Sequence, residues 1–314
     1  MKILVTGVGG QLGYDVVNEL CRRNHTVIAT DVVDRAQLAC FDAESAAARA
    51  PYAVLDITDG DAVQRLLSKE APEAVIHCAA WTAVDLAEAP ENRDRVMAVN
   101  VTGTENIAKA CKRIGAKMVY ISTDYVFDGE RETPWKPDDK AYAPLNVYGE
   151  SKLLGERAVA DQLDAYFIVR IAWVFGVNGR NFVKTMLSLS EKYDSLRVVS
   201  DQIGTPTYTY DLARLLSDMV ETDRYGYYHA TNEGGFISWY DFACEIFRTA
   251  GKTVAVQPVT TAEYGMKGAR RPFNSRLDKS KLAENGFVPL RDWREALAHY
   301  IGIITNAQNE QKEK

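Results

Sequence analysis

The sequence predicts an α/β protein whose main part is a doubly wound parallel sheet, followed by a smaller C-terminal α/β region. Short runs rich in β-branched residues alternate with longer amphipathic stretches through the first half of the chain, which is the pattern of β-α-β units. These runs are apolar on both faces, as strands covered by helices on both sides must be. After Val174 the rhythm changes, so we expect a second region to begin there.

Six runs are expected to form the strands of the main sheet. The stretches between them carry apolar residues at helical spacing, for example Val16, Val17 and Leu20, and are expected to form helices that cover the sheet. We therefore interpret residues 1–175 as one domain. The expected strands are Lys2–Thr6, Thr26–Asp31, Tyr52–Asp56, Ala74–Ala80, Lys117–Thr123 and Tyr166–Val174.

Residues 176–304 are expected to form the smaller region, with some elements returning to the first domain. Residues 305–314 are almost wholly polar and charged, which predicts a frayed tail. The region is expected to contain helices at Phe182–Tyr193, Asp211–Val220, Trp239–Ala250 and Leu290–Ile301, strands at Leu196–Val199 and Tyr227–Ala230, and a loop at Gln202–Thr209.

Composition limits the class of protein. The chain has 314 residues, of which 46% are hydrophobic and 25% charged, as in an ordinary globular protein of this size. A net charge of -6 and a pI of about 5.4 argue against general affinity for nucleic acid, which needs a basic face. No segment approaches the roughly 20 apolar residues of a membrane span, and the run before Gly7 is too short for a signal peptide. We therefore expect a soluble, cytoplasmic protein.

The cysteines and histidines indicate neither disulfides nor a metal site. The five cysteines are scattered without a C-x-x-C pair, which is typical of reduced thiols in a cytosol. The four histidines are equally dispersed, and none stands four residues from another, so the sequence has no helical pair of histidine ligands. We expect no bound metal.

A glycine-rich turn follows the first expected strand and opens the first helix. Its glycines, Gly7, Gly10 and Gly13, are spaced G-x-x-G-x-x-G, in the context that a dinucleotide-binding turn requires. The backbone amides of Gly10, Gln11 and Leu12 would then face a pyrophosphate at a helix N-terminus, where the helix dipole favours anions. The alternative is a plain strand-to-helix turn, but the context favours a Rossmann-like, dinucleotide-binding domain.

Asp31 ends the second expected strand, where a carboxylate can accept hydrogen bonds from the 2′-hydroxyl of an adenosine ribose. The same carboxylate would repel the 2′-phosphate of NADPH unless a cation intervened, and the nearest cation in sequence is Arg35. We therefore expect NADH or NADPH as cofactor, with NADH favoured. A helix cap or a solvated loop acid is the alternative interpretation of Asp31.

Tyr148 and Lys152 stand four residues apart, on one face of a helix expected to begin near Leu145. This helix should lie near the C-terminal edge of the sheet, where doubly wound folds bind ligands. A nearby ammonium stabilises a phenolate, so Tyr148 could protonate a carbonyl oxygen as hydride reaches the carbon, while Lys152 also donates to the nicotinamide ribose. Thr123, at the end of the fifth expected strand, could hydrogen-bond the same oxygen. The alternative is an ordinary surface pair.

Several segments of the chain together resemble the dTDP-4-dehydrorhamnose reductases of the extended short-chain dehydrogenase/reductase superfamily. The resemblance covers nearly the whole chain, and its later segments are the more specific ones. The segments that carry it are 10–13 (GQLG), 79–85 (AAWTAVD), 122–127 (STDYVF), 144–149 (PLNVYG), 201–207 (DQIGTPT) and 270–272 (RRP), with Ser275 and Leu277.

The resemblance implies reduction of the 4-keto group of dTDP-4-dehydro-β-L-rhamnose by NADH or NADPH, with a nucleotide sugar as the partner. It implies a catalytic trio of Thr123, Tyr148 and Lys152. Cofactor contacts are implied for Asp56, Ile57, Cys78, Ala79 and Ala80, and substrate contacts for Thr82, Thr123, Asp124, Trp173 and Arg271.

A homodimer is also compatible with the resemblance, because some members bind Mg²⁺ through acidic residues at a dimer contact. Here the position after the glycine turn is Asp15, and residues 207–210 offer no carboxylate. These residues argue against a metal-bridged dimer and leave the oligomeric state open.

Other functions remain open at this point. A 4,6-dehydratase of the superfamily would need a second acid where Tyr125 stands, which argues against that activity. The alternatives are another nucleotide-sugar reductase, an epimerase, or a non-catalytic subunit similar to the regulatory β subunit of methionine adenosyltransferase. An intact Thr123, Tyr148 and Lys152 set favours an enzyme over the non-catalytic subunit.

Overall fold

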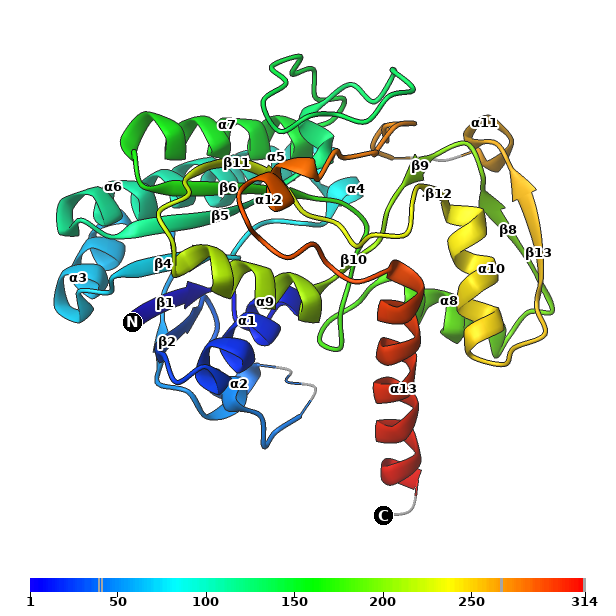
Figure 1. Ribbon diagram of the computed structural model, residues 1–314, viewed down its shortest axis with the longest axis horizontal. Helices are drawn as coiled ribbons and strands as arrows, with labels where there is room; N and C mark the ends of the chain where they lie inside the picture. Colours follow the sequence, from blue (N-terminus) through cyan, green and yellow to red (C-terminus); the bar gives the residue numbers. More distant parts are fainter. Residues whose placement is uncertain (39, 41, 266–267, 313–314) are drawn as a thin grey trace.

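The computed structural model describes residues 1–38, 40, 42–265 and 268–312, and the side chains of these residues up to 307. A parallel sheet of seven strands forms its centre, in the order β11-β6-β5-β4-β1-β2-β3 (Figure 1). The predicted fold class is confirmed. The strands are β1 (Lys2–Thr6), β2 (Thr26–Asp31), β3 (Tyr52–Val54), β4 (Ala74–His77), β5 (Lys117–Thr123), β6 (Tyr166–Ile171) and β11 (Gly226–His229).

Helices cover both faces of this sheet (Figure 1). Alternate residues of β1 enter different cores: Ile3 and Val5 pack with Val16 of α1, whereas Leu4 packs with Ile107 of α6. This two-sided burial explains why the strands are apolar on both faces. The covering helices are α1 (Gln11–Arg22) and α9 (Thr209–Val220) on one side, and α3 (Gly60–Glu70), α6 (Thr104–Ile114) and α7 (Val147–Gln162) on the other.

Three of the expected main strands end earlier in the structure. β3 ends at Val54 and β4 at His77, because the chain then turns into the loops that border the cavity described below. The run predicted as Tyr166–Val174 divides into β6 and the short β7 (Val174–Phe175). The break lies at Trp173, whose φ of +51° cannot continue a strand.

The second region adds to the main sheet and also builds small sheets of its own. The strand expected at Tyr227–Ala230 is β11, which pairs with β6 as the seventh strand. In the part of Figure 1 farthest from the N-terminus, β8 (Ser195–Val199) pairs with β13 (Ala255–Val259) beside α8 (Phe182–Ser190) and α10 (Trp239–Thr249). The predicted loop at Gln202–Thr209 contains β9 (Ile203–Gly204) and β10 (Thr207–Tyr208), which pair with β12 (Ile237–Ser238) and β7.

The C-terminal helix α13 (Trp293–Lys312) is longer than expected. The segment predicted to fray from Thr305 continues this helix to Lys312, because Ala, Gln, Glu and Lys are all good helix formers. Among the described residues, no helix is long and apolar enough to cross a membrane. The remaining helices are α2 (Ala46–Arg49), α4 (Val84–Ala87), α5 (Pro90–Met97), α11 (Thr261–Tyr264) and α12 (Ser280–Glu284), with a π-helical turn at Ala98–Gly103 and 3₁₀ turns at Arg35–Gln37 and Asp124–Val126.

Candidate active site

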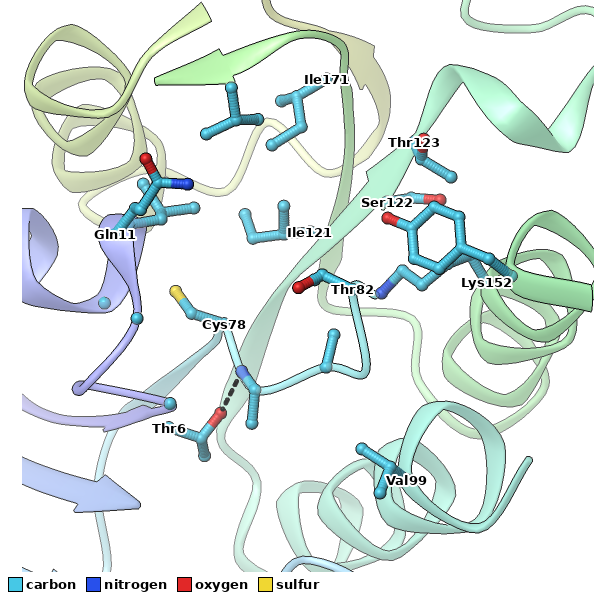
Figure 2. Close-up of a pocket in the computed structure, with 18 of the residues that line it drawn as sticks. Thr6, Gln11, Cys78, Thr82, Val99, Ile121, Ser122, Thr123, Lys152 and Ile171 are labelled. Carbon is cyan, nitrogen blue, oxygen red and sulfur yellow. Dashed lines mark hydrogen bonds between the residues drawn. The ribbon is translucent and has the colours of Figure 1, made fainter. Parts of the chain in front are cut away.

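A cavity of about 670 Å³ opens at the C-terminal edge of the main sheet. The chain leaves β1 and β4, which are neighbours, toward opposite faces of the sheet, and doubly wound folds bind ligands at this kind of switch point. Figure 2 shows the side chains that converge there. Every predicted site residue except Arg271 lines the cavity: Gly7, Gly10, Gln11, Leu12, Gly13, Asp31, Asp56, Ile57, Cys78, Ala79, Ala80, Thr82, Thr123, Asp124, Tyr148, Lys152 and Trp173.

The glycine turn between β1 and α1 is packed too tightly for larger residues. A Cβ on Gly7, whose φ is +70°, would stand 2.7 Å from the backbone nitrogen of Ala79, and one on Gly13 would stand 2.3 Å from the oxygen of Gly7. Thr6 ties the turn to the loop after β4, because its hydroxyl accepts a hydrogen bond from the Ala79 amide at 3.1 Å (Figure 2). The backbone can therefore approach a ligand closely.

The N-terminus of α1 suits an anion. Its N-cap is Gly10, which provides no side-chain cap hydrogen bond, and the first turn contains no acidic residue. Amides at such an end carry a partial positive charge and lack intrahelical acceptors. Together with the close packing at Gly7 and Gly13, this end fits the pyrophosphate of a dinucleotide.

Asp31 and Arg35 lie near each other in sequence but point to different places. The Asp31 carboxylate accepts hydrogen bonds from the amides of Gly9 at 2.9 Å and Val32 at 2.8 Å. The Arg35 guanidinium instead donates to the carbonyls of Ala48 and Ala50, at the end of α2. Arg35 is therefore occupied away from the cavity. Among the described residues, the cations that line the cavity are Arg95 and Lys152.

Tyr148 and Lys152 face the cavity from the first turns of α7. The helix begins where the Asn146 side chain accepts a hydrogen bond from the Gly149 amide at 2.8 Å. Thr123 ends β5, and the Tyr148 and Thr123 side chains are hydrogen-bonded. The Thr123 hydroxyl also donates to Asp124 Oδ1 at 3.0 Å. The structure thus brings together the three residues that were predicted as catalytic.

Burial dominates the electrostatics of this trio. It raises the pKa of Tyr148, with a further rise from Asp124 and a partial offset from the Thr123 hydrogen bond. The Tyr148 pKa is thus raised rather than lowered, because burial removes the phenolate from water. Burial also lowers the pKa of Lys152 to about 7, against opposing effects of Glu156 and Cys78. Its ammonium lies 4.1 Å from the centroid of the Tyr120 ring.

A buried ion pair, which was not among the predicted site residues, stands behind Lys152. Glu156, four residues farther along α7, bonds Arg170 of β6 at 2.7 Å, and both side chains are almost completely buried. The Ser122 hydroxyl donates to Glu156 at 2.5 Å. Glu156 is thus held in place beside the lysine. The i, i+4 spacing of Lys152 and Glu156 could have indicated that the two side chains interact. Arg170 could not be identified as the partner of Glu156, because it lies within an otherwise apolar run.

Asp124 and Trp173 line the cavity where the chain leaves β5 and β6. Burial raises the pKa of Asp124 to about 6, against hydrogen bonds from Ser275 and Thr123. The Trp173 indole stacks on Trp239 of α10 with ring centroids 3.8 Å apart. Trp239 also lines the cavity. The sequence does not predict Trp239 as a site residue, because no local pattern connects it to Trp173.

Thr82 and Arg271 stand at the margin of the site. Thr82 is exposed and lines the cavity. Arg271 is absent from the described lining: it bonds Asp85 at 2.8 Å and reaches the hydroxyl of Tyr125. Because Tyr125 itself lines the cavity, Arg271 contacts the site through that residue. Within the described part of the chain, no group of His, Cys, Asp or Glu is arranged to hold a metal.

Comparison with known proteins identifies the family. The model of the family described as RmlD substrate binding domain matches residues 1–306. The dTDP-4-dehydrorhamnose reductase of Streptomyces griseus is 41% identical over 300 residues, which are 94% of this chain and 91% of that protein.

Two solved structures agree with this match. A dTDP-4-dehydrorhamnose reductase from Clostridium acetobutylicum is 42% identical with a TM-score of 0.87, over 97% of this chain and 100% of that one. The enzyme of Bacillus anthracis, solved in complex with NADP, is 38% identical with a TM-score of 0.83, over 95% and 98%. The resemblance seen in the sequence is therefore confirmed. This chain belongs to the RmlD substrate binding domain family.

Proposed function

We propose that this protein reduces the 4-keto group of dTDP-4-dehydro-β-L-rhamnose to give dTDP-L-rhamnose, using NADH or NADPH. One observation carries the proposal: a single cavity holds a glycine turn at a helix N-terminus together with Thr123, Tyr148 and Lys152. Full-length similarity to named dTDP-4-dehydrorhamnose reductases supports the choice of substrate.

NADH or NADPH bound at the glycine turn would supply the hydride. The amides of Gln11 and Leu12 would bind the pyrophosphate, and Asp56 and Ile57 would border the adenine half. The Gly10 amide, which was expected to join them, instead donates to the Gly7 carbonyl at 3.1 Å. Cys78, Ala79 and Ala80 would border the central part. All of these residues line the same cavity, which supports this assignment.

Tyr148 would act as the proton donor. Because its pKa is raised, the hydroxyl stays protonated at neutral pH and can donate to the keto oxygen of the sugar. Thr123, hydrogen-bonded to Tyr148, would donate to the same oxygen and stabilise the charge that develops on it.

Lys152 would have two tasks. It stands one helical turn after Tyr148 and lines the same cavity, so its ammonium can stabilise the tyrosine as the phenol loses its proton. It would also donate to the nicotinamide ribose. Glu156 favours the charged form of Lys152 against the effect of burial.

We further propose that NADH is used at least as well as NADPH. Asp31 presents a carboxylate at the cavity, whereas Arg35 is bonded to α2 and directed away from it. A 2′-phosphate would meet the negative charge of Asp31 without a compensating cation from Arg35. The NADP complex of the Bacillus anthracis relative is the reason why NADPH is retained as a cofactor.

The test is a spectrophotometric assay of NADH and NADPH oxidation with purified protein and dTDP-4-dehydro-β-L-rhamnose. Oxidation that depends on the sugar is expected with both cofactors. An epimerase would rearrange the sugar without net oxidation of the cofactor, and a non-catalytic subunit would do neither. Either result would contradict the proposal.

A further inference from the structure

Trp173 has a strained backbone at the edge of the cavity. Its φ of +51° lies in the left-handed region, which a bulky residue rarely adopts. The residue stands between β6 and β7, and it lines the cavity. Strain of this kind persists only where the surrounding structure holds it, and it is found most often at sites that bind or react.

Two residues of the second region confine the Trp173 indole. The ring of Trp239 stacks on it, with centroids 3.8 Å apart and planes inclined by 16°. Gly204 approaches the same indole so closely that a Cβ would stand 2.9 Å from Cε2 and 3.1 Å from Cζ2. The same Cβ would stand 3.0 Å from the Cβ of Ser275, so any residue larger than glycine at position 204 would have to shift the ring or Ser275.

One small sheet positions both confining residues. In the antiparallel pair of β9 and β12, Gly204 stands opposite Ile237, and Trp239 follows β12 as the first residue of α10. A capping box fixes that start: the Ser238 hydroxyl accepts from the Asp241 amide at 3.0 Å, and the Ser238 amide donates to the Asp241 carboxylate at 2.9 Å. The second region thus supports a residue that follows β6 of the main sheet.

The sheet register places this indole near the reacting end of the cavity. Ile171 of β6 is paired with Thr123 of β5, so Trp173 comes two residues after the partner of a proposed catalytic residue. The glycine turn lies farther along the sheet, after β1. An indole face is a flat apolar surface, and beside Thr123 it suits the C–H face of a 6-deoxy pyranose better than the nucleotide base.

We propose that Gly204 and Trp239 are positioning residues, which hold the Trp173 indole in place to receive the apolar face of the sugar and to orient its 4-keto carbon toward Tyr148. The inference deepens the proposed function and rests on it. Contacts that lock a site before the ligand arrives reduce the ordering needed on binding. They also matter for rate, because small misplacements at a reacting centre are costly.

Two variants test the proposal through steady-state kinetics. Trp239→Leu removes the stack but keeps an apolar side chain, and Gly204→Ala adds a Cβ that would crowd the indole at 2.9 Å and the Cβ of Ser275 at 3.0 Å. For each, kcat/KM for the nucleotide sugar should fall about tenfold or more, through both a higher KM and a lower kcat. The KM for the cofactor should stay within about twofold of wild type, because the glycine turn is unchanged.

A conservative variant and a matched control accompany them. Trp239→Phe keeps a ring in the stack and should recover part of the loss. Tyr240→Leu changes the next residue of α10, which is not among the described lining of the cavity, and should behave as wild type. Circular dichroism monitors the pair without turnover: the coupled signal of two stacked indoles should be present in wild type and lost in both Trp239→Leu and Trp173→Phe.

The outcomes separate the inference from the proposed function. If wild type reduces the sugar and both Trp239→Leu and Gly204→Ala keep its kcat/KM, the positioning role is wrong and the proposed function stands. If the KM values for sugar and cofactor rise together, the damage is general and the positioning role is also wrong. If wild type does not reduce the sugar, both proposals fail.

Discussion

Tyr148→Phe removes one oxygen from the cavity and leaves the rest of the residue in place. The ring should keep its edge-on contact with Tyr125, at a centroid distance of 5.8 Å. The lost hydrogen bond to Thr123 should cost only about 1 kcal/mol of unfolding free energy. We therefore expect the variant to fold and to bind NADH or NADPH as wild type does.

Catalysis should respond very differently. General-acid catalysis contributes about 10²–10⁴-fold, so kcat should fall by that factor, which corresponds to roughly 2.7–5.4 kcal/mol in the activation barrier. In wild type, the raised pKa of Tyr148 also predicts that kcat does not decline through loss of this proton up to about pH 9.

The assay is steady-state oxidation of the reduced cofactor at saturating sugar, repeated with deuterated cofactor to establish whether hydride transfer limits the rate. Cofactor binding is measured separately by fluorescence. If hydride transfer is rate-limiting and Tyr148→Phe keeps more than about a third of wild-type kcat, the loss falls far short of a general-acid effect and Tyr148 is not the proton donor.

Three further predictions concern charged residues of the cavity and the core. Asp31→Ala should raise the KM for NADH more than the KM for NADPH, because the carboxylate is expected to favour a ribose hydroxyl and to oppose a phosphate; equal changes with both cofactors would contradict this role. Lys152→Ala should lower kcat and also weaken cofactor binding, measured by fluorescence titration, because one ammonium serves both tasks; a loss of kcat alone would exclude the ribose contact. Asp15, hydrogen-bonded to Thr209, has its pKa raised to about 7 by burial. A carboxyl with a raised folded-state pKa favours the fold fully below its unfolded pKa, and that stability is lost as pH rises toward the folded value. The free energy of unfolding should therefore fall by roughly 4 kcal/mol between about pH 4 and pH 7 through this group. Urea unfolding of Asp15→Asn should show a smaller decline than wild type, and an unchanged pH profile would refute the assignment.

The main sheet could be predicted closely because burial on both faces leaves a continuous apolar run, and β1, β2 and β5 match their expected ranges. The sequence could not show where the run after Tyr166 breaks, because no neighbouring residue marks the left-handed backbone of Trp173, and its indole packs against Trp239 of another region. β9 and β10 have two residues each, too few to produce a periodic pattern. The extension of α13 to Lys312 differs from the expected frayed tail because a polar segment can still contain residues that favour helix.

The candidate site was predictable where function depends on local spacing. The glycine turn and the Tyr148–Lys152 pair are both encoded within a few residues, and both line the cavity. Contacts that depend on tertiary folding were not predictable: Trp239 reaches Trp173 from another region, and the Glu156 and Arg170 side chains meet across α7 and β6. The direction of the Tyr148 pKa shift was not predictable from the sequence either, because burial in the folded chain sets it.

Transfer of deuterium from labelled NADH tests the central claim most directly. Purified protein is incubated with dTDP-4-dehydro-β-L-rhamnose and NADH deuterated at the transferable position, and the sugar is analysed by mass spectrometry and NMR. We expect one deuterium at C4 of dTDP-L-rhamnose with wild type, and almost none in the same time with Tyr148→Phe. A product without deuterium at C4, or equal labelling by the two proteins, would contradict the account.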